Sequence, residues 1–272
     1  MITNTCVEKL KCVDCGSMDN RQVYLNVDTD LGVEWFTSFC HGACWEQKGD
    51  PYTGDKPAPK VVPKTEEEKR EEMLTVLNCP LFKPTKGFRK ITAETYQHFR
   101  VRLLFSEYDG ITPYAVAFPF SLGSSLSGYK CRPLFTPRGA KKKFFAHGEV
   151  KTADLFGMWL AIRNNFSNDI LFATEGEYDT LAAYQMTSGE YPFVSIKSGA
   201  GSAARDLAPI MDYWKRVIII LDDDPAGRES AEKTRELLPK LEYIWLKEYK
   251  DPNDYLMNDA SAEFVRIIKD II

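Results

Sequence analysis

The chain has 272 residues, of which 44% are hydrophobic and 27% charged, and its net charge at pH 7 is −4. This composition excludes general disorder, and the length suits one sizeable core with a small additional module. The sequence begins without the basic residues and apolar run of an export signal. It also lacks the roughly 20 consecutive apolar residues of a membrane span, so we expect a cytoplasmic protein with no membrane partner.

The charges are distributed unevenly along the chain. Residues 83–151 contain 13 Lys and Arg against 4 Asp and Glu, which gives this segment a net charge of +9. The rest of the chain is therefore strongly acidic. A positive segment of this kind predicts contacts with phosphate groups, although the average charge is negative.

Four cysteines lie close together near the N-terminus, as the pairs Cys12 and Cys15 and Cys40 and Cys44. In a chain without an export signal, such a cluster indicates metal ligands before disulfides. The Cys-x-x-Cys spacing of the first pair holds a tetrahedral ion from a single turn, so we predict one structural Zn2+. In the second pair His41 has the same spacing to Cys44, so either Cys40 or His41 could complete the site. The preference of Zn2+ for thiolates favours Cys40.

Residues 1–50 are predicted to form a small β module. Apolar residues alternate over 23–27 and again over 33–35, which predicts two strands that bring the cysteine pairs together. A module of this size needs a bound metal for the stability that its small core cannot supply. Residues 51–64 contain four prolines and little to bury, which predicts an extended tether.

The segment 65–165 is predicted to be an irregular, basic α+β lobe. Thr65 and Glu68 make a capping box at the start of a helix that should run to about Leu77. We expect the apolar side of this helix to be formed by Met73, Leu74 and Leu77. Further along, Tyr114, Val116 and Phe118 alternate as in a strand.

From residue 166 onward, short apolar runs alternate with helical stretches. The runs cover 170–173, 193–196, 217–221 and 243–246, and the helical stretches cover 179–187, 202–212, 226–238 and 261–270. This order is typical of a parallel α/β sheet.

Carboxylates follow three of these predicted strands. They are Glu175, Glu177 and Asp179, then Asp222, Asp223 and Asp224, and finally Asp251 and Asp254. Parallel sheets bind ligands at the carboxyl ends of their strands, and oxygen-only ligands favour Mg2+ or Mn2+. In an extended chain Asp222 and Asp224 face one side while Asp223 turns away. The alternative is that these groups are solvated loop acids or acids at helix N-termini.

The runs Glu175–Asp179, Asp222–Arg228 and Lys250–Asp254 resemble the Toprim motifs. Toprim modules occur in DnaG-type primases, topoisomerases, and some nucleases and repair proteins. The order of a zinc module, a tether, a basic lobe and Toprim resembles the primase half of tailed-phage primase-helicases over nearly the whole chain. The resemblance implies an α/β fold in which a zinc-ribbon-like β module (1–50) is tethered to an RNA polymerase domain, made of a basic α+β lobe (65–165) and a Toprim α/β sheet (166–272).

The resemblance also implies roles for individual residues. Glu175 would assist chemistry at the primer 3′ end, Glu175, Asp222, Asp224 and Asp251 would hold Mg2+ or Mn2+, and Glu177 and Asp179 would support the site. Lys130 and either Lys142 or Lys143 would bind nucleotides. The zinc module would read the template, with Arg21 and Trp35 among its candidate contacts. The neighbouring basic residues Arg132 and Lys141 are expected to meet phosphates.

The implied function is that of a DNA primase, which makes short RNA primers from ribonucleoside triphosphates on single-stranded DNA in the host cytoplasm. A replicative helicase and a DNA polymerase are the implied protein partners. Two alternatives stay open. One is a Toprim nuclease, and the other is a non-catalytic DNA-binding repair protein that joins zinc cysteines to Toprim.

Overall fold

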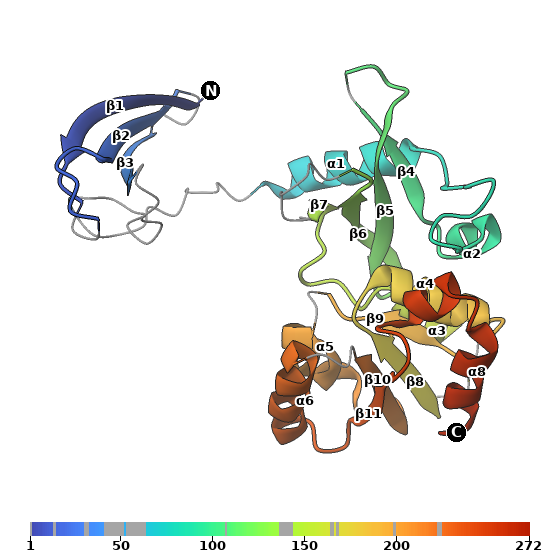
Figure 1. Ribbon diagram of the computed structural model, residues 1–272. Coiled ribbons are helices and arrows are strands. Elements are labelled where there is room, and N and C mark those ends of the chain that lie inside the picture. The colour runs from blue at the N-terminus through green and yellow to red at the C-terminus, as the bar shows by residue number, and fades with distance from the viewer. Residues whose placement is uncertain are drawn as a thin grey trace. The chain divides into compact units, whose positions relative to one another are not determined.

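The computed structural model divides into two compact units, residues 1–63 and 64–272 (Figure 1). The residues that it describes are 2–12, 15–29, 33–40, 52, 64–106, 108–135, 144–163, 166, 169–197, 200–221 and 225–272. Several predicted site residues lie outside these ranges, namely His41, Cys44, Lys141, Lys142, Lys143, Asp222, Asp223 and Asp224. Within the described ranges, none of the helices has the length and apolar character needed to cross a membrane.

The first unit contains a three-stranded antiparallel sheet. Its strands, in the order β1-β2-β3, are β1 (Ile2–Leu10), β2 (Arg21–Asp28) and β3 (Val33–Cys40). The two predicted strands correspond to β2 and β3. Strand β1 was not predicted, because its sequence contains few large apolar residues, and it pairs along the length of β2.

The second unit begins with α1 (Glu66–Asn78), whose first turn carries the predicted capping box. The Thr65 hydroxyl accepts from the backbone N–H of Glu68 at 3.2 Å, and the Glu68 carboxylate accepts from the backbone N–H of Thr65 at 2.7 Å. These two bonds satisfy N–H groups that a helix start leaves without intrahelical partners.

The predicted apolar side of α1 is confirmed for Met73 and wrong for Leu74 and Leu77. Val76 is buried and Met73 packs beside it against the antiparallel sheet, whereas Leu74 is 42% exposed and Leu77 is 38% exposed. Positions 73 and 76 are neighbours on a helix surface, and 74 and 77 form the adjacent stripe. The helix has two apolar stripes, and its neighbours decide which one is buried.

A four-stranded antiparallel sheet follows α1. Its order is β4-β5-β6-β7, with β4 (Arg102–Phe105), β5 (Pro113–Leu122), β6 (Ser125–Pro133) and β7 (Phe145–Gly148), and α2 (Ala93–His98) precedes it. Both faces of β5 are covered. Ala117 faces the α1 side, and Val116 and Phe118 belong to the larger core on the other side. Tyr114 packs on the α1 side, so only Val116 and Phe118 follow the predicted alternation.

The predicted parallel α/β sheet is confirmed. Its order is β11-β10-β8-β9, with β8 (Ile170–Thr174), β9 (Phe193–Ser195), β10 (Arg216–Leu221) and β11 (Glu242–Trp245), and all neighbours are parallel. The helical segments are α3 (Met158–Arg163), α4 (Glu177–Met186), α5 (Ala203–Leu207), α6 (Pro225–Leu237), α7 (Pro252–Met257) and α8 (Ser261–Lys269), with 3-10 turns η1 (Ala200–Ser202) and η2 (Ala208–Ile210). Helices α5 and α6 pack on one face, and α4, α7 and α8 pack on the other (Figure 1).

Candidate active site and metal centre

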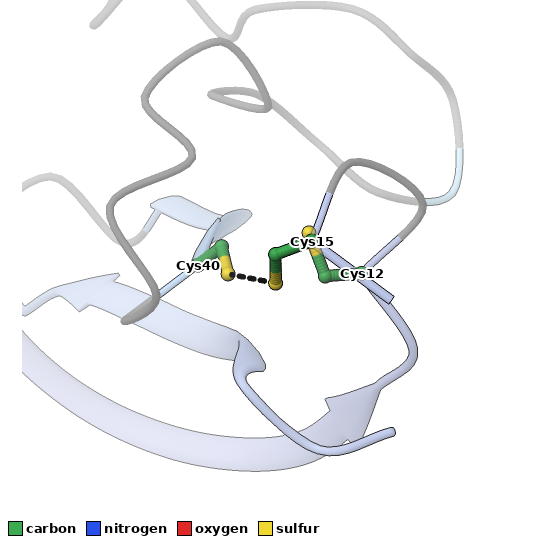
Figure 2. A group of neighbouring side chains, drawn as sticks. All are labelled: Cys12, Cys15 and Cys40. Carbon is green, nitrogen blue, oxygen red and sulfur yellow. Dashed lines mark hydrogen bonds between the residues drawn. The ribbon is translucent and has the colours of Figure 1, made fainter. Parts of the chain in front are cut away.

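Three of the predicted zinc ligands lie together in the first unit. The sulfur atoms of Cys12, Cys15 and Cys40 are all within 4.8 Å of one another, and those of Cys15 and Cys40 are 3.7 Å apart (Figure 2). Four thiolates around Zn2+ at about 2.3 Å are separated from one another by about 3.8 Å, so this spacing fits a tetrahedral site. The fourth predicted ligand, Cys44, lies outside the described residues, and so does His41, the predicted alternative to Cys40.

A tight turn presents the first cysteine pair. The N–H of Gly16 donates to the carbonyl of Cys12 at 3.0 Å, and the N–H of Cys12 donates to the carbonyl of Ser17 at 2.8 Å. Gly16 has a φ of +72°, a left-handed conformation that favours glycine. Cys12 is buried and Cys15 is exposed, and Cys40 ends β3 as a buried residue. The turn and the strand end therefore bring soft ligands from distant parts of the sequence together.

The predicted template contacts lie on the same sheet. The Arg21 guanidinium, on β2, donates to the hydroxyl of Ser38 on β3 at 3.1 Å. Trp35 is half-buried on β3. Tyr24 stacks on Phe39, with ring centroids 6.2 Å apart. Arg21 is thus held by a neighbouring strand, and the sheet also presents aromatic side chains.

In the second unit, the acidic groups follow strands that are neighbours in the sheet. The chain passes from β8 to β9 on one side and then to β10 on the other side of β8. The order of the strands therefore reverses between β8 and β10. Open parallel sheets bind ligands at the carboxyl ends of the strands where this reversal occurs. Glu175 directly follows β8, and Asp222 directly follows β10 in the sequence.

The turn from β8 into α4 is fixed by a buried threonine pair. The hydroxyl groups of Thr174 and Thr180 are 2.8 Å apart, and the Thr174 hydroxyl donates to the carbonyl of Gly176 at 3.1 Å. Gly176 is the N-cap of α4, which begins at Glu177. Negative side chains are favoured at a helix N-terminus by the backbone dipole. This turn therefore supports Glu177 in the first turn of α4.

A pocket of about 360 Å³ lies beside this turn in the second unit. The charged side chains that line it are Arg89, Arg132, Glu177, Asp179 and Asp251. It therefore brings together acids that follow β8 and β11 with cations that precede the parallel sheet. Glu175 is half-buried next to this turn but does not line the pocket.

Glu177, in the first turn of α4, links this helix to β6 of the antiparallel sheet. The Glu177 carboxylate lies 2.5 Å from the Lys130 ammonium and accepts from the Arg132 guanidinium at 3.1 Å. Lys130 and Arg132 are two residues apart on β6, so they project from the same side of the strand. The side chains of Lys130 and Glu177 are each only 1% exposed. Glu177 therefore balances buried positive charge and holds β6 against α4.

The Lys130 ammonium also contacts a backbone carbonyl and an aromatic ring. It donates to the carbonyl of Lys197 at 2.6 Å and lies 4.7 Å from the centre of the Phe144 ring. Burial lowers the pKa of Lys130, and the negative charge of Glu177 opposes this shift. A cation over an aromatic face and beside a carboxylate is stabilised by both contacts.

Sequence reasoning missed Arg89 and Asn253. The Arg89 guanidinium lies 4.5 Å from the centre of the Tyr178 ring and donates to the side-chain oxygen of Asn253 at 3.1 Å. The Asn253 amide in turn donates to the carbonyl of Arg89 at 3.1 Å. Arg89 and Lys90 have left-handed backbones, with φ of 54° and 56°, which is uncommon for two successive non-glycine residues. The sequence offered one signal, because Asn253 lies within the Lys250–Asp254 run.

Asp251 serves as the N-cap of α7 and also lines the pocket. Its carboxylate accepts from the backbone N–H of Asp254 at 2.8 Å. Burial raises the pKa of Asp254, and the negative charge of Asp251 raises it further. Within the described residues, the cysteines form the only group of three potential metal ligands. The predicted magnesium ligands Asp222 and Asp224 lie outside the described residues.

Comparisons with known proteins match this geometry. Residues 172–256 match the family described as Toprim-like. The DNA helicase/primase of Enterobacteria phage T3 is 33% identical over 107 residues, which are 38% of this chain and 18% of the phage protein. The DNA primase of Pasteurella multocida is 28% identical over 185 residues, which are 65% of this chain and 29% of that protein. The primase fragment of the bacteriophage T7 primase-helicase protein, known from its crystal structure, matches with a TM-score of 0.57 and 23% identity over 97% of this chain and 100% of the fragment.

Residues 172–256 of the second unit therefore form a Toprim-like domain, and the fold of the chain is like that of the T7 primase fragment. Among proteins with this domain, the chain has DNA primases and a phage primase-helicase as relatives, which confirms the resemblance and the predicted fold class. The matched regions span less than a third of the length of either sequence relative.

Proposed function

We propose that the protein is a DNA primase, an enzyme that copies single-stranded DNA into short RNA primers from ribonucleoside triphosphates. The observation that carries the proposal is a single pocket in which the acidic edge of the Toprim sheet faces Arg89 and Arg132. Nucleotidyl transfer needs both charges, because cations bind the triphosphate and carboxylates hold the metal ions. Relatives named as primases support this proposal over other Toprim enzymes.

The acidic residues would hold Mg2+ or Mn2+. Asp222, Asp224 and Asp251 would be ligands, and Glu175 would assist at the primer 3′ end. The carboxylate of Asp251 in the pocket is a hard oxygen donor of the kind that these ions prefer. When bound, the ions would activate the attacking hydroxyl and stabilise charge on the leaving pyrophosphate.

Glu177 and Asp179 would support the site in different ways. Glu177 fixes Arg132, which lines the pocket, so this cation would meet a triphosphate in a defined position, and the buried Lys130 would hold Glu177 in place. Asp179 lines the pocket two residues further along α4. Lys141 would contact phosphates, and Lys142 or Lys143 would bind nucleotide next to Lys130.

The first unit would bind one structural Zn2+ through Cys12, Cys15, Cys40 and Cys44, with His41 as the substitute ligand. The sulfur spacing supports this assignment. The ion would fix the turn after β1 to the end of β3, and Arg21 and Trp35 on that sheet would contact the template. Residues 1–50 would thus recognise the template, 51–64 would tether them, and the lobes 65–165 and 166–272 would carry out synthesis.

A replicative helicase is the proposed protein partner, because the phage T3 relative is named as a helicase and a primase together. A DNA polymerase would extend the primers. The proposed place of action is the cytoplasm of the host cell.

A primer-synthesis assay tests the proposal. The protein would be incubated with Mg2+, labelled ribonucleoside triphosphates and single-stranded DNA templates of varied sequence. We expect short labelled RNA whose formation depends on the template. Cleavage of labelled DNA without any RNA product would favour the Toprim nuclease, and DNA binding without either reaction would favour the non-catalytic repair protein.

A further inference from the structure

The parallel sheet carries a second pocket, which shares no lining residue with the one described above. It has a volume of about 380 Å³ and lies between α6 and the edge strand β11. Its lining residues are Arg228, Ala231, Glu232, Arg235, Trp245 and Lys247. None of the roles proposed above uses this pocket, which we call the α6–β11 groove.

Trp245 lines the groove, and Tyr243 lies beside it on the same strand. Tyr243 and Trp245 lie two residues apart on β11 and so face the same side, where α6 packs. Their ring centroids are 6.4 Å apart and their planes differ by only 12°. The Arg235 guanidinium lies 4.9 Å from the centre of the Tyr243 ring. Both residues are half-buried, and the hydroxyl of Tyr243 is buried.

The charges of the groove are mainly positive. Arg228, Arg235 and Lys247 are exposed cations, and Glu232 is the single acid among the described residues of the lining. Arg228 and Arg235 are two helical turns apart on α6, which corresponds to about 10 Å along the helix axis. Successive phosphates of one DNA strand rise by about 3.4 Å in a duplex, so this row of cations can span more than one nucleotide.

The groove lies at the same edge of the sheet as the acidic groups. Trp245 pairs in register with Leu221, the last residue of β10, and Asp222 follows directly in the sequence. A nucleic-acid strand that leaves the carboxyl edge of β10 toward β11 would therefore pass over the groove.

We propose that the α6–β11 groove binds single-stranded nucleic acid, with a base stacked on Trp245 and phosphates paired with Arg228, Arg235 and Lys247. An aromatic ring beside a row of cations provides both contacts that single strands need. An acidic peptide would satisfy the cations but would leave the aromatic ring unused. This proposal rests on the proposed function in one respect only, which is that the bound strand is the template or the new primer.

Fluorescence anisotropy with a fluorescein-labelled oligothymidylate tests the groove, using the full chain without nucleotides. We expect Trp245→Ala to weaken binding at least about fivefold, since stacking on an aromatic side chain contributes at this level or above. Trp245→Phe keeps an aromatic face and should stay within about twofold of the parent. Lys247→Ala should weaken binding about threefold and make its salt dependence shallower, because it removes one phosphate contact.

Two exposed residues outside the groove provide matched controls. Tyr213→Ala removes an aromatic ring and Arg266→Ala removes a cation on α8, and neither should change affinity by more than about twofold. Thermal unfolding of each variant identifies any loss of fold. Lys247→Ala and Trp245→Phe are expected to keep the fold, because the first changes only an exposed side chain and the second keeps an apolar ring.

The proposal assigns a stacking contact to Trp245 and a phosphate contact to Lys247. It would be overturned if Trp245→Ala and Lys247→Ala both bound the oligonucleotide within about twofold of the parent affinity. The proposal would also be overturned if Trp245→Ala lost as much affinity for an oligonucleotide without bases as for oligothymidylate, because stacking would then play no part. Displacement of the oligonucleotide by polyglutamate at equal charge concentration would indicate an acidic peptide site instead. If the variants lose binding but the parent makes no primers, the groove is a nucleic-acid site and the proposed function is wrong. If the parent makes primers but the variants keep full binding, only the proposal for the groove is wrong.

Discussion

Among the described residues of the first unit, the buried apolar side chains are Cys12, Val23 and Cys40, whereas the second unit buries three hydrophobic clusters. Two of those three buried residues are also candidate metal ligands. The second unit instead packs large aromatic groups such as Phe99, Phe156 and Phe172.

This contrast teaches that the two units draw their stability from different sources. Burial of apolar surface stabilises a domain roughly in proportion to area, and the described part of the first unit offers little of it. Metal binding can replace a core in a small domain, because the free energy of binding becomes free energy of folding. The second unit should be stable without any metal, and its metal ions would serve chemistry alone.

Removal of zinc should have the largest effect and should affect the first unit alone. Cys12→Ala, or a chelator at pH 7, should unfold residues 2–40, because structural zinc contributes about 10–16 kcal/mol in small zinc modules. Elemental analysis should find one zinc ion per parent chain and none in the variant. Cys6→Ala changes an exposed cysteine outside the cluster and should retain the ion. Backbone amides of the chelated protein that stay protected over residues 2–40 would contradict this source of stability.

Loss of the Glu177 charge should destabilise the second unit. Glu177→Gln leaves the Lys130 ammonium buried without its counter-charge, which should lower the free energy of unfolding by about 3–5 kcal/mol. Replacement of both by apolar residues, Lys130→Met with Glu177→Leu, should restore most of the loss. Urea unfolding measures both, and Glu190→Gln at an exposed position is the control. A loss below about 1 kcal/mol would mean that water reaches the ion pair.

Substitution of the acids after β10 should lower activity without changing the stability of the second unit. Asp222→Asn or Asp224→Asn should each lower primer synthesis at least about a hundredfold, or about 3 kcal/mol of transition-state stabilisation, because each would remove a proposed metal ligand. Asp223→Asn should keep most of the activity, because this side chain should point away from the ion. The midpoint of thermal unfolding and the affinity for single-stranded DNA should not change. The register proposed for the metal ligands would be abandoned if Asp223→Asn were the most damaging of the three.

The smallest effect concerns Glu149, which connects the end of β7 to α1. Its carboxylate accepts from Lys69 at 3.0 Å and from the backbone N–H of Lys151 at 2.8 Å. The Lys69 ammonium is the main cause that holds the pKa of Glu149 below its usual value, followed in the same direction by the backbone N–H groups of Thr152 and Lys151. Because the folded state lowers this pKa, the contribution to stability is present at neutral pH and is lost as the pH falls below about 4.3.

Glu149→Gln should therefore lower the free energy of unfolding by roughly 0.5–1 kcal/mol at pH 7, a small value because the pair is partly exposed. The difference between variant and parent should shrink toward zero in acid. Urea titrations at several pH values provide the measurement, and Glu67→Gln on the exposed side of α1 is the control. A difference that stays constant down to pH 3 would show that the charge of Glu149 contributes nothing.

The sequence by itself determined features that depend on residues close together along the chain. The capping box of α1, the four strands of the parallel sheet and the Cys12–Cys15 half-site all follow from local spacing or periodicity. The position of Glu175 at a strand end follows in the same way. Short-range patterns succeed here because hydrogen bonding within an element, or along one strand, fixes where each side chain points.

Only the tertiary structure decided which of these features meet. Glu177 finds its partners on β6, and Arg89 finds Asn253 across 164 positions of sequence. The periodicity of α1 allowed either of two stripes to be buried, and its neighbours selected Val76. A pattern along the chain specifies the face of an element but not the surface that covers it. Partners, burial and pKa shifts therefore depend on long-range packing that the sequence pattern does not contain.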